Sequence, residues 1–127
     1  MRTVKLNDGK ERPIHFDFNS IAEIQDRYDD ITLLTEKIKK FKEIRWLVTE
    51  GINEGISKRN HDIGTSDEPM TEFEVGMIIP LSKLKLQAIV SEIVAAFHDC
   101  MGTEKNALAG DLTIQANSTQ DIPKTIE

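Results

Sequence analysis

Apolar and polar residues alternate near the start of the chain, with the two-residue period of a half-buried β-strand. The alternation predicts one strand over Arg2–Asn7 and a second over Glu11–Phe18. Asp8-Gly9 lies between them, and this dipeptide favours a type I′ turn, so we expect a β-hairpin over residues 2–18. Pro13 has no N–H group, which predicts a sheet edge or a bulge at that position.

The period changes to that of a helix directly after the second strand. Asn19 or Ser20 is expected to cap this helix, and Ser20 with Glu23 has the spacing of a capping box. These signals predict a first helix over about residues 20–28.

A second and a third helix are expected in the middle of the chain. Asp30 or Thr32 would cap the second, over about residues 31–40. The third, over about residues 42–57, is indicated by an apolar stripe at helical spacing, formed by Phe41, Ile44, Leu47, Val48, Ile52 and Ile56.

Two glycines, Gly51 and Gly55, lie on or beside this stripe, four residues apart. In a helix interior each glycine costs about 1 kcal/mol relative to alanine. We interpret the pair as a packing feature that allows a neighbouring helix to approach closely.

The second half of the chain is expected to hold a loop and two helices. Thr71 and Glu74 have the spacing of another capping box, and Pro80 should end the helix that starts there. Gly102 is expected to cap the end of the last helix. The predicted elements are a polar loop over residues 59–69 and helices over about residues 71–79 and 82–101.

Together these elements predict an α+β fold, with an N-terminal β-hairpin packed on a mostly helical bundle in a single globular domain over residues 1–102. Residues 103–127 contain no aromatic side chain and are mostly small or polar. Such a segment lacks the apolar area needed to offset its ordering entropy. We therefore expect a flexible tail, or a segment that becomes ordered only on a partner.

The charge of the chain narrows the class of partner. Its 127 residues carry a net charge of −6, whereas nucleic-acid binding requires a basic surface. The N-terminus lacks the apolar core of a signal peptide, and no apolar run is long enough to span a membrane. Cys100 is the single cysteine, so an internal disulfide is impossible. These features favour a protein of the cytoplasm that binds neither nucleic acid nor membrane.

Residue types that carry most enzyme chemistry are few and scattered. His98 lies two residues from Cys100, and positions i and i+2 of a helix point in different directions. With His15 and His61 elsewhere, the set does not match the ligand spacings of zinc sites. We therefore expect no catalytic residue, no metal site, no cofactor and no enzyme activity.

Most of the chain, from about Val4 to Met101, follows a pattern found in small phage proteins. A hairpin whose second strand ends in Phe-Asn leads into an acidic helix, a helix with Trp and Gly, a capped helix and a final helix. The segments that carry this pattern are Val4–Gly9, Pro13–Ile21, Glu23–Tyr28, Phe41–Gly55, Thr71–Ile79 and Ile89–Met101. In this order of elements the chain resembles the tail assembly chaperones of siphophages, contractile-tailed phages and related defective prophages.

The resemblance implies a function without catalysis. Such chaperones bind the tape measure protein, prevent its aggregation and help tail tube subunits polymerise around it; self-association is a further expectation. They act in the host bacterial cytoplasm and are absent from the mature virion. Many also have a longer product made by ribosomal frameshifting, and Glu104-Lys105-Asn106 can be encoded by a run of adenines that permits slippage.

The family supplies no active-site residues, so the expected partner contacts are inferred from side-chain chemistry. Met and aromatic side chains adapt to irregular apolar partners, and a helical domain can bind a partner helix in a groove. The candidate partner-binding residues are Trp46, Phe73, Met77, Ile78 and Ile79. The alternative for each is a place in the core, which is the favoured interpretation of Trp46.

Two other classes of function stay open. One is a structural tail completion or terminator protein that remains in the virion. The other is a small enzyme or regulatory protein with a site that the sequence does not reveal.

Overall fold

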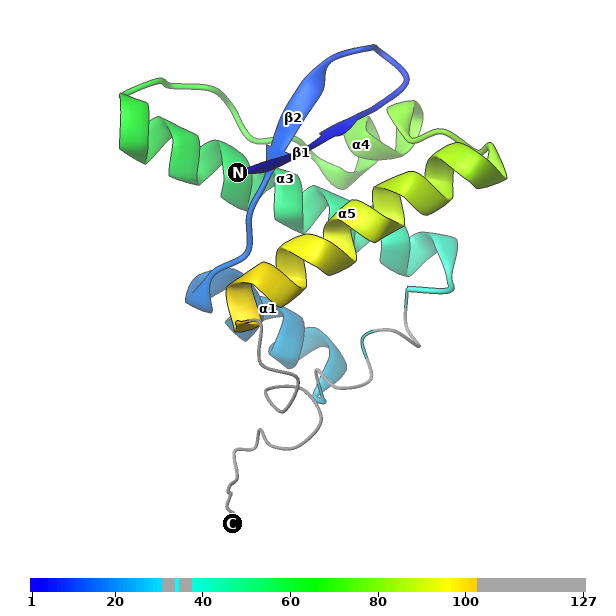
Figure 1. The fold of residues 1–127 in the computed structure, drawn as a ribbon, viewed down its shortest axis with the longest axis horizontal. Coiled ribbons are helices and arrows are strands. Elements are labelled where there is room, and N and C mark those ends of the chain that lie inside the picture. The colour runs from blue at the N-terminus through cyan, green and yellow to red at the C-terminus, as the bar shows by residue number, and fades with distance from the viewer. Residues whose placement is uncertain (31–33, 35–37, 103–127) are drawn as a thin grey trace. The chain divides into compact units, whose positions relative to one another are not determined.

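The computed structural model describes residues 1–30, 34 and 38–102, and it has the predicted α+β architecture (Figure 1). Its elements are β1 (Arg2–Lys5), β2 (Glu11–Ile14), α1 (Phe18–Tyr28), α3 (Phe41–Ile63), α4 (Glu72–Ile78) and α5 (Lys83–Met101). Met1–Phe97 form one compact unit. The predicted tail over residues 103–127 and most of the predicted helix over residues 31–40 lie outside the described residues.

The predicted hairpin is present, but its second strand is shorter than expected. The strands pair antiparallel from Arg2 opposite Ile14 to Lys5 opposite Glu11. Phe16 is buried, as the alternation predicted, whereas Phe18 is 87% exposed. The strand prediction fails at Phe18 because this residue is already the first residue of α1.

The turn between the strands is not the predicted type I′. The Gly9 N–H donates to the Leu6 carbonyl oxygen at 2.9 Å, and Gly9 has a φ of 79°. A type I′ turn needs positive φ at both central residues, and Asp8 is not among the described residues with positive φ. Asp8 instead accepts two hydrogen bonds from the Arg12 guanidinium, at 2.9 and 2.7 Å, which lower the Asp8 pKa to about 2.

The first helix begins earlier than predicted. Asp17 is its N-cap: the Ser20 N–H donates to Asp17 Oδ1 at 3.2 Å, and the Asp17 N–H donates to Ser20 Oγ at 2.7 Å. The predicted caps, Asn19 and Ser20, and the predicted box of Ser20 with Glu23 are therefore wrong. Ser20 lies at the third helical position, where its hydroxyl also donates to the Asp17 carbonyl at 3.0 Å.

The helix predicted over residues 42–57 continues to Ile63, which shortens the predicted polar loop. Its last turns are polar, so the apolar stripe gave no sign of them. Lys58 and Asp62, four residues apart, form an ion pair at 3.0 Å that supports these turns. Gly64 then ends the helix in the left-handed conformation, with its N–H on the Asn60 carbonyl at 3.0 Å.

Gly55 admits the backbone of a strand, not the helix that was expected, whereas Gly51 leaves room for side chains, one of them from α5. A Cβ atom on Gly55 would lie 2.5 Å from the Pro13 carbonyl oxygen, and one on Gly51 would lie 3.1 Å from Ile14 Cγ2. The His15 N–H donates to the Gly51 carbonyl at 3.0 Å. The predicted close approach is thus confirmed, and at Gly55 its partner is the backbone of β2.

The helix predicted over residues 82–101 is α5, and it crosses α3 in Figure 1. Ile93 Cδ1 would lie 3.4 Å from a Cβ on Gly51. The Phe97 ring meets that of Phe16 edge to face, with centroids 6.3 Å apart. Leu84, near the start of this helix, is 79% exposed.

Candidate partner-binding groove

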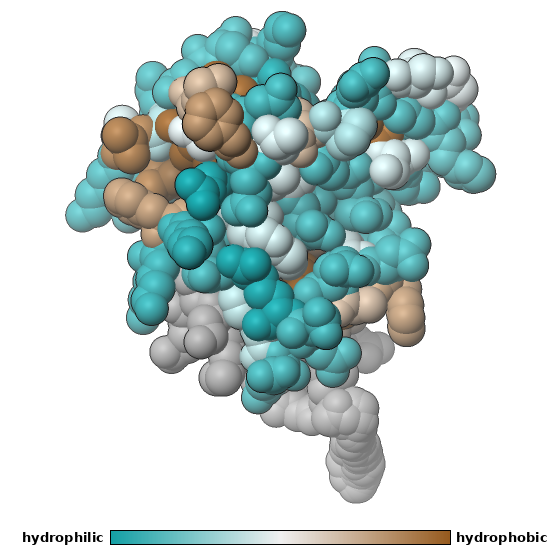
Figure 2. Space-filling view, turned by 180° about the vertical axis from the view of Figure 1, so that it is seen from behind, coloured by the Kyte–Doolittle hydropathy of each residue, from teal (hydrophilic) through white to brown (hydrophobic). Residues whose placement is uncertain are grey.

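An open groove of about 650 Å³ lies between the hairpin turn, the start of α3, the end of α4 and the start of α5. We call it the α4 groove. In Figure 2, apolar side chains gather at the upper left, on the side of the molecule that holds α4. The residues that line the groove are Asn7, Phe41, Lys42, Ile44, Arg45, Gly76, Met77, Ile79, Leu81 and Leu86. Of these, Phe41, Met77 and Leu81 are well exposed.

The short helix α4 is fixed in place from three sides. Val75 is completely buried. The Asn53 amide donates to the Met70 carbonyl and accepts from the Met70 N–H, both at 2.8 Å. At the other end, the Asn7 N–H of the hairpin turn donates to the Ile78 carbonyl at 2.8 Å. These contacts hold α4 so that Met77 lines the groove.

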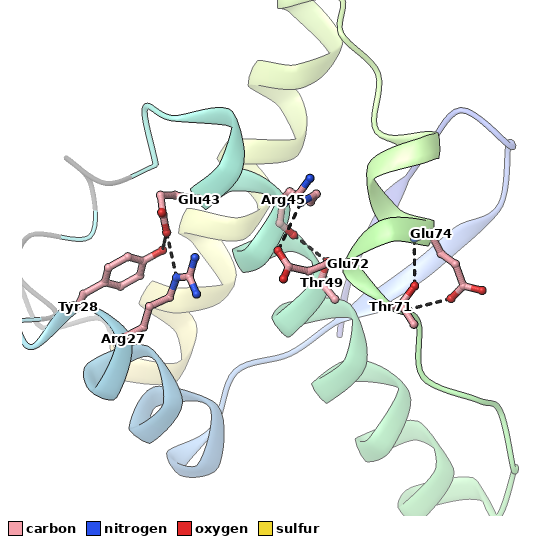
Figure 3. A network of polar contacts seen from close by, with 8 residues as sticks. All are labelled: Arg27, Tyr28, Glu43, Arg45, Thr49, Thr71, Glu72 and Glu74. Carbon is pink, nitrogen blue, oxygen red and sulfur yellow. Dashed lines mark hydrogen bonds and ion pairs between the residues drawn. The ribbon is translucent and has the colours of Figure 1, made fainter.

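The predicted capping box at the start of α4 is confirmed (Figure 3): the Glu74 N–H donates to Thr71 Oγ1 at 3.1 Å, and the Thr71 N–H donates to Glu74 Oε1 at 2.9 Å. Arg45 of α3 pairs with Glu72 at 3.4 Å. A Cβ atom on Gly76 would lie 3.0 Å from Arg45 Cδ. The glycine therefore leaves room for the arginine stem on the groove wall.

The five predicted contact residues do not form one site. Met77 and Ile79 line the groove. Phe73 is 74% exposed on α4 but is not part of the lining. Ile78 is half-buried and contributes its carbonyl to the hydrogen bond from Asn7.

Trp46 belongs to a separate cluster beside α1. The guanidinium carbon of Arg27 lies 4.5 Å from the centre of the Trp46 ring, and the Tyr28 ring meets it edge to face at 6.0 Å. Tyr28 and Arg27 both donate to Glu43 Oε1, at 2.6 and 2.9 Å (Figure 3). Burial and the bond to Glu43 raise the Tyr28 pKa to about 12, and the two donors lower the Glu43 pKa. Trp46 is half-buried within this cluster.

Sequence reasoning missed three apolar residues that line the groove without being buried. Phe41 was assigned to the buried stripe, but it is the first residue of α3, where neighbouring turns do not yet fix its direction. Leu81 lies between two helices, and Leu86 faces the groove from the first turns of α5. The available signal was the apolar run from Ile78 to Leu81, which exceeds what one short helix can bury.

A group of carboxylates lies beside the contact of β2 with α3. Burial, followed by the negative charges of Asp17 and Glu50, raises the Glu54 pKa to about 7. Burial and the charge of Glu23 raise the Glu50 pKa as well. Within the part of the chain that the structure describes, no group of three or more His, Cys, Asp or Glu side chains is placed to hold a metal ion.

No model of a known protein family, no curated protein and no solved structure matches this chain. Among residues 1–30, 34 and 38–102, no helix has both the length and the apolar character that crossing a bilayer requires.

Proposed function

We propose that this chain is a non-enzymatic phage tail assembly chaperone whose α4 groove binds amphipathic helical segments of the tape measure protein. The observation that carries the proposal is the exposure of Phe41, Met77 and Leu81 around one open groove. A partner helix can bury its apolar stripe in such a groove, which shields that stripe from aggregation. The adaptable thioether of Met77 suits a partner that presents many similar segments.

The charged side chains beside the groove indicate which kind of partner helix it favours. Lys42 and Arg45 line it together with the apolar residues, and Glu72 offsets part of the Arg45 charge. Basic side chains beside an apolar groove favour a helix that carries acidic residues next to its apolar stripe. By the resemblance, tail tube subunits and a second copy of the chain are further partners, and the site of action is the host cytoplasm.

The test is co-expression with the tape measure and tail tube proteins encoded beside this chain, followed by co-purification and a solubility assay. We expect the wild-type chain to keep the tape measure protein soluble. The double variant M77S/L81S should weaken binding at least about tenfold, because each side chain buries apolar area in the complex. The matched control is F18S/I63S, which replaces two apolar side chains that are equally exposed but lie outside the groove.

Two results would reject the proposal. In one, the tape measure protein stays insoluble beside the wild-type chain. In the other, the groove variant and the control variant bind equally well. Detection of the chain by mass spectrometry in purified virions would favour the rival function, a structural tail completion or terminator protein.

A further inference from the structure

One edge of the hairpin is left unpaired by the sheet. Thr3 lies opposite Pro13, which has no N–H group. Opposite residues in an antiparallel ladder alternate between pairs that exchange two N–H···O=C hydrogen bonds and pairs that exchange none, so Thr3 and Pro13 form a pair of the second kind. The neighbouring pairs on either side exchange the hydrogen bonds. In an antiparallel ladder, Thr3 and Lys5 then direct their N–H and C=O groups away from β2.

Contacts on both sides of the hairpin support this assignment. On β2, the carbonyl of Pro13 lies against Gly55, so this residue directs its backbone toward α3 and not toward β1. Asn7, just beyond β1, is two residues after Lys5, so its N–H points to the same side as those of Thr3 and Lys5. This N–H donates to α4 and not to β2. Within the described part of the chain, the outward groups of Thr3 and Lys5 form no backbone hydrogen bond to another element.

A second open hollow, of about 640 Å³, runs along this edge. We call it the β1 groove. Its other wall is one face of α5, because the residues that contribute recur at i, i+3, i+4 and i+7: Lys85, Ala88, Ile89 and Glu92. Neighbouring strands in a sheet lie about 4.8 Å apart, so a strand added to β1 would lie within this hollow.

The charges of the β1 groove are basic, although the whole chain is acidic. Arg2 and Glu92 lie in the groove and pair with each other at 3.3 Å. Lys5 and Lys85 also line it, and neither forms an ion pair with the described residues. A second copy of the chain would place the same basic strand against itself, whereas an acidic segment would complement both lysines.

We propose that the β1 groove binds an extended acidic peptide segment of another protein, which adds to β1 as a third strand. The backbone groups of Thr3 and Lys5 would hydrogen-bond the peptide main chain, and Lys5 and Lys85 would select its carboxylates. This proposal concerns a different surface from the α4 groove and does not depend on the chaperone function.

The test uses the full chain and a short fluorescent peptide in which valine and glutamate alternate, with binding followed by fluorescence anisotropy. Two matched peptides replace glutamate by lysine or carry N-methyl groups on alternate amides. The variant T3P removes one outward N–H group and leaves the ladder bonds, and T3V is its control because it keeps that group. We expect T3P to weaken binding about three- to tenfold, and K5E and K85E up to about fivefold each, with T3V unchanged.

The proposal is supported if the acidic peptide binds, both matched peptides bind much more weakly, and amide NMR shifts concentrate on β1. It is overturned if the N-methylated or lysine peptide binds equally well, or if T3P binds like T3V. It is also overturned if the chain alone is a dimer in sedimentation and β1 amides are protected in that dimer, since a second copy then occupies the edge.

Discussion

Helix α3 makes two contacts of opposite character. Against β2, Gly55 lets the strand backbone approach so closely that no side chain fits between them. Against α4, the Arg45 stem lies on Gly76, and an open groove remains beside it. The first contact is made by backbone, which cannot adapt, and the second by long side chains, which can. The comparison indicates that the hairpin contact secures the fold, while the α4 contact leaves a surface for a partner.

The largest effect is expected from Gly55→Ala. Its new methyl group would lie 2.5 Å from the Pro13 carbonyl oxygen, which is backbone, so β2 and α3 must separate. We expect a loss of about 3 kcal/mol in the free energy of unfolding, measured by urea denaturation. Gly51→Ala is the matched control: its methyl group meets side-chain atoms of Ile14 and Phe16 at 3.1 Å and no backbone atom, so we expect a smaller loss of about 1 kcal/mol. Equal losses would contradict the rigid character of the contact.

The next effect concerns the support of α4. Asn53→Ala removes both hydrogen bonds to Met70, and leaves two part-buried backbone groups without partners. We expect a loss of about 1–2 kcal/mol in the free energy of unfolding, together with faster hydrogen exchange in α4. The matched change is Asn60→Ala, whose bonds to Asp67 lie in an exposed loop and should cost about 0.5 kcal/mol. Unchanged exchange in α4 would show that Val75 alone holds the helix.

For Gly76→Ala we expect a change in the free energy of unfolding of the opposite sign. The new methyl group would lie 3.0 Å from Arg45 Cδ, the far part of a flexible side chain that can move aside. Alanine is the better helix former, so the free energy of unfolding should rise, by up to about 1 kcal/mol. Thermal and urea unfolding both measure this change. If Gly76→Ala lowered the free energy of unfolding as much as Gly55→Ala, the contact of α3 with α4 would be as rigid as its contact with β2, contrary to the comparison.

The smallest expected effect is a pH dependence of stability. It arises from a carboxylate beside the contact of β2 with α3. Because the folded chain raises the Glu54 pKa from 4.5 to about 7, the folded state holds a proton that the unfolded state releases. This contribution to stability is complete below pH 4.5 and is lost as the pH rises through 7. Glu54→Gln should therefore stabilise the chain by about 0.5 kcal/mol at pH 8 and flatten the profile between pH 5 and 8. Glu68→Gln, in an exposed loop, is the matched control for the loss of one carboxylate.

The elements were predictable where a local signal dominates. The hairpin, the Thr71–Glu74 capping box and the last helix follow from alternation, cap spacing and a long apolar stripe. The start of α1 and the end of α3 were missed because a neighbouring cap, Asp17, and a polar ion-paired turn decided them.

The candidate site was harder to predict, because exposure depends on partners distant in sequence. Met77 and Ile79 were identified from their residue type, and their place in the groove follows from the contacts of α4. Trp46 has the same apolar character, but its ring contacts Arg27 and Tyr28, residues of another helix. No sequence pattern within one helix distinguishes a residue that lines the groove from one that packs against another helix.

The approach of Pro13 to Gly55 also sets an order of events during synthesis. These residues are 42 positions apart, so the hairpin leaves the ribosome well before the helix that it packs on. At about 5–20 residues per second, the delay is about 2–8 s. An isolated two-stranded hairpin is only marginally stable in water. The hairpin is therefore made before the helix that secures it, and until α3 is complete both edges of the nascent hairpin stand open to other chains.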